Sequence, residues 1–153
     1  MSETVAPISF VQVTRGSLAE RWPSDNTSYR GAGLPPEHWS FFVAGKKYRS
    51  NMFLATSFSA EVATEFARNN SSPEKPPTIF HFHFDPSLRC THVNLIKSLI
   101  PSESEFLFPP YAVFTVRSAD FETPGQNGMF EIHLDVAPDN KLELEDLPLS
   151  PWN

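Results

Sequence analysis

The sequence predicts a single α+β domain, built mainly from antiparallel strands with few helices. Two segments alternate strictly between apolar and polar residues, TIFHFHF at 78–84 and MFEIHLDV at 129–136, as strands with one buried side do. Helical patterns are short and lie in the first half of the chain. Fifteen prolines disfavour long helices, and a length of 153 residues suits one domain spanning residues 1–153.

The first half of the chain is expected to begin with strands and a short helix. Residues 8–14, ISFVQVT, alternate as a strand does, and residues 53–56, FLAT, read as a second, shorter strand. Between them, two prolines precede EHWSFFVAG, which ends at Gly45. Proline in the first turn and glycine after the last turn predict a short helix there, in which we expect the two phenylalanines to be core residues.

A second helix is expected over residues 60–68. Ser57 or Ser59 can cap its first turn, because a serine hydroxyl accepts from the free backbone N–H groups at a helix start. The spacing of its apolar residues predicts one buried face, formed by Val62, Ala63 and Phe66.

The second half of the chain is expected to consist of strands and loops. Residues 69–77, NNSSPEKPP, form a loop. In the strand that follows, His81 and His83 face away from a buried side formed by Phe80, Phe82 and Phe84. A further strand starts near Glu103, breaks at two prolines and resumes over 111–116. The proline-rich tail LEDLPLSPWN is expected to lie over the body of the domain.

Composition narrows the class of protein. The net charge of −6 and pI near 5.3 argue against a nucleic-acid binder with a large basic surface. Cys90 is the single cysteine, so no intrachain disulfide can form. The start, MSETVAPISF, has neither a basic region nor a long apolar region, and no apolar run approaches a membrane span. We therefore expect a cytoplasmic monomer, or an effector exported without a signal peptide, that does not enter membranes.

Glu103 and Glu105 stand at the start of an otherwise apolar segment, EFLFPPYAVF. On a strand, residues two apart point to the same face, so these carboxylates would project together. Two glutamates at a strand end are usually solvated surface. A carboxylate pair beside an apolar run also suits an enzyme that cleaves a glycosidic bond, because one carboxylate stabilises the oxocarbenium-like transition state and the other orients the nucleophile.

Three segments in this order carry a resemblance to a known family: YRG at 29–31, FLATSFS at 53–59 and ESEFLFPP at 103–110. They resemble the arginine-specific mono-ADP-ribosyltransferases, whose signature is Arg, then Ser-Thr-Ser, then Glu-x-Glu, and among them the small stand-alone type. The resemblance implies split, mainly antiparallel sheets around an NAD cleft. It also implies a glycosyltransferase that uses NAD as its substrate, without a metal, releases nicotinamide and modifies an arginine of a protein target.

The resemblance also implies roles for the three segments. Arg30 would hold the NAD pyrophosphate, since a guanidinium grips two phosphate oxygens at once. Gly31 would let the nicotinamide amide approach the backbone. Glu105 would be the catalytic glutamate, bonded to the nicotinamide ribose, and Glu103 would engage the acceptor guanidinium. Ser57 would be the second serine of Ser-Thr-Ser.

Other residues of these segments are assigned on the same basis. Thr56 is the threonine of Ser-Thr-Ser, and Tyr29 stands with Arg30 at the NAD site. Phe58 is a candidate to stack on nicotinamide, whereas Phe53 is better explained by core packing. Outside these segments, Arg49 stands shortly before FLATSFS and is either a second anion contact for NAD or a solvated surface residue.

One position departs from the family pattern and keeps alternatives open. Ala55 occupies the place of the first serine, whose hydroxyl helps to hold the catalytic glutamate in the family. Ser57, Thr56 or a water molecule must then hold it. The alternatives are an NAD glycohydrolase, a catalytically silent NAD-binding module, and a glycosidase that uses Glu103 and Glu105 as its acid and base.

Two further features of the sequence bear on function. His81 and His83, together with His92, suggest a metal site, because His-x-His places two imidazoles on one strand face. No third or fourth ligand has convincing spacing, so the exposed face of an antiparallel strand is the preferred interpretation and no metal is expected. Residues 94–102, NLIKSLIPS, match the place of the family's target-recognition loop and either pack inward or contact a partner.

Overall fold

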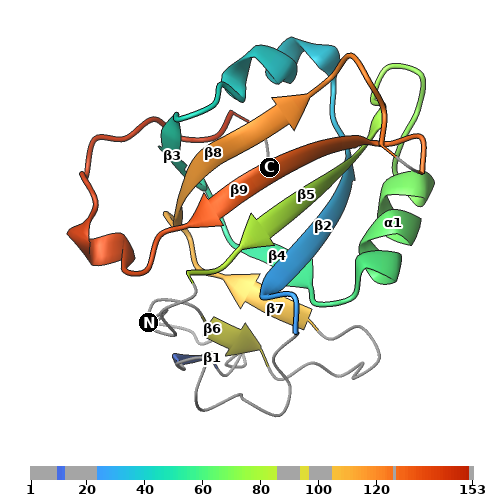
Figure 1. The fold of residues 1–153 in the computed structure, drawn as a ribbon. Helices are drawn as coiled ribbons and strands as arrows, with labels where there is room; N and C mark the ends of the chain where they lie inside the picture. Colours follow the sequence, from blue (N-terminus) through green and yellow to red (C-terminus); the bar gives the residue numbers. More distant parts are fainter. Residues whose placement is uncertain (1–9, 13–23, 86–93, 97–104, 126, 152–153) are drawn as a thin grey trace, which may run out of the picture.

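The computed structural model describes residues 10–12, 24–85, 94–96, 105–125 and 127–151. Their strands form a sheet in the order β1-β6-β7-β4-β2-β5-β9-β8-β3 (Figure 1). The strands are β1 (Phe10–Gln12), β2 (Thr27–Gly33), β3 (Lys47–Arg49), β4 (Leu54–Ser57), β5 (Pro77–His83), β6 (Asn94–Ile96), β7 (Glu105–Phe108), β8 (Val113–Asp120) and β9 (Phe130–Val136). The helices are α1 (Ala60–Asn69) and the short 3₁₀ helices η2 (Pro36–Phe41) and η4 (Asn140–Leu142).

The sheet is divided between β4 and β2. These strands are joined by one residue pair, Tyr29 with Ser57, whereas β2 and β5 are paired along the whole of β2. In Figure 1, β7 runs at a marked angle to β2 and β5. All described strand pairs are antiparallel except β5 with β9. The expectation of split, mainly antiparallel sheets with few helices is confirmed.

Helix α1 covers one face of the sheet beside β2 (Figure 1). Its N-cap is Ser59, whose hydroxyl accepts from the backbone N–H of Val62. Its inner face consists of Ala63 and Ala67, which are buried. The expectation that Phe66 belongs to this buried face is wrong, because its side chain is 54% exposed. The expected helix after the two prolines is η2, a single 3₁₀ segment.

The main hydrophobic core lies on the other face of the sheet. The alternation predicted for 78–84 and 129–136 is confirmed, since one side of each segment is buried there. Phe42 is buried in this core and Phe41 packs against it, as expected, but Phe53 is exposed and does not fill the core role expected of it. The largest fully buried side chains are Phe82, Phe106, Phe108, Phe114, Ile132 and Leu134. Burying each contributes about 1.5–3 kcal/mol.

The C-terminal segment lies against the body, as its prolines predict. Its attachment centres on Arg49, whose guanidinium donates to the carbonyl oxygens of Leu144, Glu143 and Tyr111, with a longer contact to Asn140. Arg49 is buried and donates to several backbone carbonyls at once, so it holds this segment against the body. Among the described helices, none has the length and apolar character needed to cross a membrane.

Candidate functional site

A row of paired residues crosses the sheet from β7 to β9. Strand register places Glu105 opposite Ser57, Ser57 opposite Tyr29, Tyr29 opposite His81, and His81 beside His133. Side chains at paired positions point to the same face of a sheet. Because Tyr29 packs against the buried alanines of α1, this row lies on the face that α1 covers.

A cavity of about 160 Å³ lies at the Glu105 end of this row, beside the split between β4 and β2. It brings together most of the residues that the sequence assigned to NAD. Its lining consists of Tyr29, Arg30, Gly31, Ala55, Thr56, Ser57, Val62, Ala63, Phe66 and Glu105. Pockets for drug-sized ligands measure about 300–1,000 Å³, so this cavity has room for one end of a dinucleotide.

The strand pair β4–β7 holds Glu105 in place. The buried hydroxyl of Thr56 donates to the carbonyl oxygen of Phe106 at 2.7 Å, which ties β4 to the residue after Glu105. The hydroxyl oxygen of Ser57 accepts from the backbone N–H of Ser59 at 3.0 Å and stands directly opposite Glu105 in the register. Thr56 therefore supports the strand backbone, and Ser57 is the hydroxyl that faces the same side as Glu105.

Arg30 lies across the split in the sheet. Its Nη1 donates to the carbonyl oxygen of Ala55 on β4 at 3.0 Å, and Arg30 lines both this cavity and a second one that Phe80 and Phe82 also line. Burial lowers the pKa of the guanidinium, because desolvation disfavours its charged form. No carboxylate of the described residues forms an ion pair with it. A half-buried cation without a counter-ion among the described residues favours the arrival of an anion.

Tyr29 and Gly31 shape the cavity between β2 and α1. The Tyr29 hydroxyl donates to the carboxylate of Asp25, and burial together with this bond raises the pKa of the phenol. A Cβ atom at Gly31 would lie 1.8 Å from the carbonyl oxygen of Ala63. Glycine is therefore required here by the close approach of α1, a packing reason that differs from the ligand approach expected from the sequence.

Other residues assigned from the sequence lie elsewhere. Arg49 holds the C-terminal segment and does not line the cavity. Phe58 packs against Phe106 in the core, with ring centroids 5.2 Å apart, and is also outside the cavity lining. Glu103 and His92 lie outside the described residues, as does most of the segment 94–102.

The sequence analysis missed two cavity residues on α1, Val62 and Phe66. Helical spacing identified both as apolar residues on one face, but it assigned that face to the core. The exposure of Phe66 follows from the two small alanines behind it, which bring the helix so close to β2 that the larger side chains lie at its edge. The apolar wall of the cavity could be found only once this approach was known.

Comparisons with known proteins give a clear result for the fold. No protein-family model matches the chain, and a search of curated proteins finds no significant match. The ADP-ribosyltransferase Vis, a toxin from Vibrio splendidus, matches with a TM-score of 0.57 in its complex with the M6 inhibitor, at 21% identity, over 75% of this chain and 50% of that chain.

Two further proteins match in the same way. The ADP-ribosyltransferase HopU1 of Pseudomonas syringae pv. Tomato DC3000 matches with a TM-score of 0.51 at 20% identity, over 73% of this chain and 44% of that chain. The type III effector XopAI from Xanthomonas axonopodis pv. citri matches with a TM-score of 0.52 at 18% identity, over 79% of this chain and 47% of that chain. The chain spans about half the length of these structures and has the ADP-ribosyltransferase fold.

Proposed function

We propose that this chain is an NAD-dependent mono-ADP-ribosyltransferase that transfers ADP-ribose to the guanidinium of an arginine in a protein target. One observation carries the proposal. A half-buried Arg30, which has no counter-ion among the described residues, and Glu105 line the same cavity, with the Ser57 hydroxyl between β2 and β7. The cation suits a diphosphate, and the carboxylate suits a sugar that gains positive charge in the transition state.

The proposed reaction breaks the bond between ribose C1′ and the nicotinamide nitrogen. The bonding electrons leave with nicotinamide, which becomes neutral, and the sugar passes through an oxocarbenium-like state. Glu105 stabilises that positive charge and binds a ribose hydroxyl. A guanidinium nitrogen of the acceptor then bonds to C1′ and loses a proton, for which Glu103 is the proposed acceptor.

The size of the cavity fits the nicotinamide end of NAD and not the whole dinucleotide. The cavity of about 160 Å³ between β2, β4 and α1 is of a size to hold the nicotinamide end. The apolar side chains of Val62 and Phe66 provide a wall for an aromatic ring, and Arg30 at the split is the contact for the diphosphate. The rest of the dinucleotide would then extend beyond the cavity.

An arginine acceptor is supported by the Glu-x-Glu pattern at 103–105 and by one of the structural matches. Vis has been crystallised with agmatine, a small molecule that carries a guanidinium, and this chain matches that structure with a TM-score of 0.55 at 21% identity. We infer that the same acceptor chemistry applies here, with a protein arginine as the natural substrate.

The first experiment measures the reaction itself. The protein is incubated with NAD labelled in its ADP-ribose part and with agmatine, and nicotinamide release, free ADP-ribose and labelled agmatine are quantified together. We expect the amount of nicotinamide released to equal the sum of labelled agmatine and free ADP-ribose. Most of the label should be in agmatine. Release without labelled agmatine would make the chain a glycohydrolase, and NAD binding without release would make it a silent module, the outcome that Ala55 keeps open.

Glu103→Gln separates transfer from hydrolysis. Water needs less help than a protonated guanidinium, so this variant should lose transfer to agmatine and keep most of the hydrolysis of NAD. A parallel loss of both products would contradict the assignment of Glu103 to the acceptor. Ser57→Ala serves as a comparison that acts on the Glu105 side of the site and should reduce both products.

A further inference from the structure

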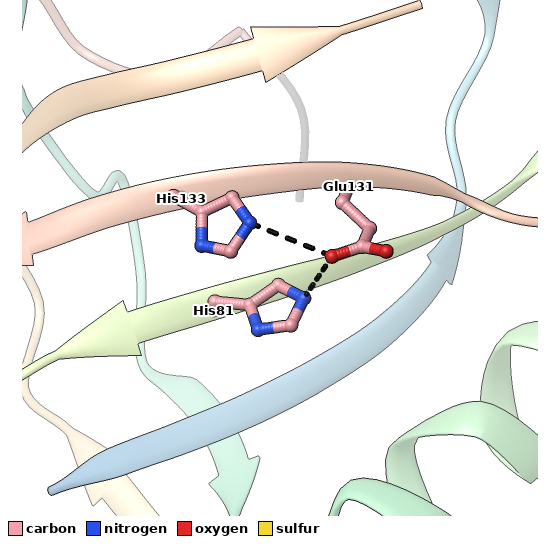
Figure 2. Close-up of side chains that lie close together, drawn as sticks. All are labelled: His81, Glu131 and His133. Carbon is pink, nitrogen blue, oxygen red and sulfur yellow. Dashed lines mark ion pairs between the residues drawn. The ribbon is translucent and has the colours of Figure 1, made fainter. Parts of the chain in front are cut away.

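Three side chains converge on the sheet face at the other end of the row from Glu105 (Figure 2). His81 comes from β5, and Glu131 and His133 come from β9, the strand parallel to it. The Oε1 atom of Glu131 lies 3.0 Å from Nε2 of His81 and 3.5 Å from Nε2 of His133. The three ligand atoms all lie within 4.8 Å of one another.

Hydrogen bonds do not account for this convergence. The Nε2 atom of His81 is buried and has no hydrogen-bond partner among the described residues, although Glu131 is at contact distance. The ring nitrogen therefore does not point along the line to the carboxylate oxygen. Two ligands of one tetrahedral ion have this geometry, because each points at the ion and their bonds meet there at about 109°.

A chain of hydrogen bonds decides which nitrogen of His133 carries a proton. The Thr27 hydroxyl donates to the carbonyl oxygen of Asp25 at 2.9 Å, so its oxygen can only accept from Nδ1 of His83, 3.3 Å away. A neutral imidazole with its proton on Nδ1 has an acceptor at Nε2. The partner of that acceptor is Nδ1 of His133, at 2.9 Å, which must donate.

A neutral His133 with its proton on Nδ1 presents a bare lone pair at Nε2. That lone pair lies 3.5 Å from Oε1 of Glu131, and Nε2 of His81 lies 3.0 Å from the same oxygen without a hydrogen bond to it among the described residues. Two acceptors, the His133 nitrogen and the carboxylate, thus meet without a donor between them. A cation is the species that satisfies such an arrangement.

We propose that His81, Glu131 and His133 form a binding site for a divalent transition-metal ion of the zinc class. Zn²⁺ takes two imidazole nitrogens and one carboxylate oxygen at about 2.0–2.2 Å, and the edge of such a tetrahedron is about 3.3 Å. The two nitrogen–oxygen distances, 3.0 and 3.5 Å, lie on either side of that value. His83 acts on the ion through His133, by fixing the tautomer of that ligand.

The surroundings hold the carboxylate in position and leave one coordination position open. A Cβ atom at Gly125 would lie 2.0 Å from Oε2 of Glu131, so the absence of a side chain there makes room for the carboxylate. His81, Glu131 and Gly125 line a cavity of about 410 Å³. The fourth position of the ion would open towards this cavity and take water or a small anion.

The competing explanation is a proton in place of the metal. A charged His133 would carry a proton on Nε2 and form an ion pair with Glu131. The two explanations differ in whether Nε2 of His133 carries a proton in metal-free protein. Nitrogen NMR of the imidazoles should show the His133 proton on Nδ1 and a bare Nε2, and a proton on Nε2 would overturn the proposal.

Binding of the metal alone gives the main test, with tag-free protein. Titration with Zn²⁺ by calorimetry should show one saturable site, and Co²⁺ should give the visible absorption of a four-coordinate ion. Glu131→Gln, His81→Gln and His133→Gln should each weaken binding by more than about 100-fold, since each removes a ligand, a larger loss than the 10–100-fold typical of outer partners. The matched controls are Asp135→Asn on the same strand and His38→Gln on η2, which should bind normally.

Two further variants test the supports of the site. His83→Phe removes the acceptor for His133 and should weaken Zn²⁺ binding by about 10–100-fold. Gly125→Ala should weaken it by displacing the carboxylate. Absence of a saturable site in the wild type, or binding that survives Glu131→Gln, would overturn the proposal, and circular dichroism confirms that each variant is folded. None of these readouts depends on NAD chemistry.

Discussion

The row that crosses the sheet ends in two sites with opposite electrostatic requirements. At the Glu105 end, the half-buried guanidinium of Arg30 has no counter-ion among the described residues and favours an anion. At the His133 end, a carboxylate and two ring nitrogens meet and require a cation. Tyr29, paired with Ser57 on one side and His81 on the other, lies between the two sites.

The opposite charge preferences of the Glu105 end and the His133 end show how one sheet can hold two sites that remain chemically separate. Strands lie about 4.8 Å apart, so the four steps from Glu105 to His133 span about 19 Å. Charges at that separation in solvent are largely screened, since it exceeds the Debye length of about 8–10 Å. A substitution at the Glu105 site should therefore leave the His133 site unaffected, and the reverse should also hold.

The largest effect is expected from Glu105→Gln, which keeps the shape of the side chain and removes its charge. Loss of one preorganised electrostatic contact costs about 10²–10³ in rate, so both transfer and hydrolysis of NAD should fall by that factor. Binding of NAD and of Zn²⁺ should be almost unchanged. Nicotinamide release measures the rate, and a variant that hydrolyses NAD at nearly the wild-type rate would remove Glu105 from the catalytic role.

Gly31→Ala is expected to disturb the packing that both ends share. The added methyl group would meet the backbone of α1, and overpacking of this kind costs about 1–3 kcal/mol. Because residues of α1 line both cavities, the variant should lower the melting temperature and weaken NAD binding. Thermal unfolding measures the first effect. Unchanged stability would mean that α1 can move away from β2 without cost.

Arg30→Lys is expected to affect the anion site alone. Lysine keeps the charge but loses the planar fork that grips two phosphate oxygens, so NAD should bind about tenfold more weakly, a change near 1.4 kcal/mol. Calorimetry with NAD measures the change, and Zn²⁺ binding is the internal control. Unchanged affinity for NAD would place the diphosphate away from Arg30.

The smallest effect is expected from Ser59→Ala at the start of α1. The variant removes the hydroxyl that accepts from the Val62 N–H, and loss of such a cap costs about 1 kcal/mol. Chemical denaturation measures this loss of stability. Binding of NAD and of Zn²⁺ should be unchanged. Thr64→Ala is the control substitution elsewhere on the helix. A much larger loss would show that Ser59 also fixes Ser57, whose oxygen accepts from its backbone N–H.

Much of the fold was determined locally and could be predicted. Alternation along β5 and β9 identified their buried sides, because the side-chain period of a strand is two whatever its neighbours are. The serine before α1 and the prolines and glycine around η2 favour the start or end of the adjacent helical turn, so their effect does not depend on distant parts of the chain. The segments containing Arg30, Ser57 and Glu105 were likewise identified from short motifs, and the structure brings all three to one cavity.

Only the tertiary structure decided which of these segments are neighbours. It joined β5 to β9 in parallel, which set His81 beside His133 from positions 52 residues apart along the chain and supplied the ligands that the spacing around His81 lacks. It also turned Arg49 towards the C-terminal carbonyls and Phe66 out to the cavity rim. The physical reason is common to these cases: a residue type and its local period are written in the sequence, but its partner depends on long-range strand pairing and on how closely elements pack.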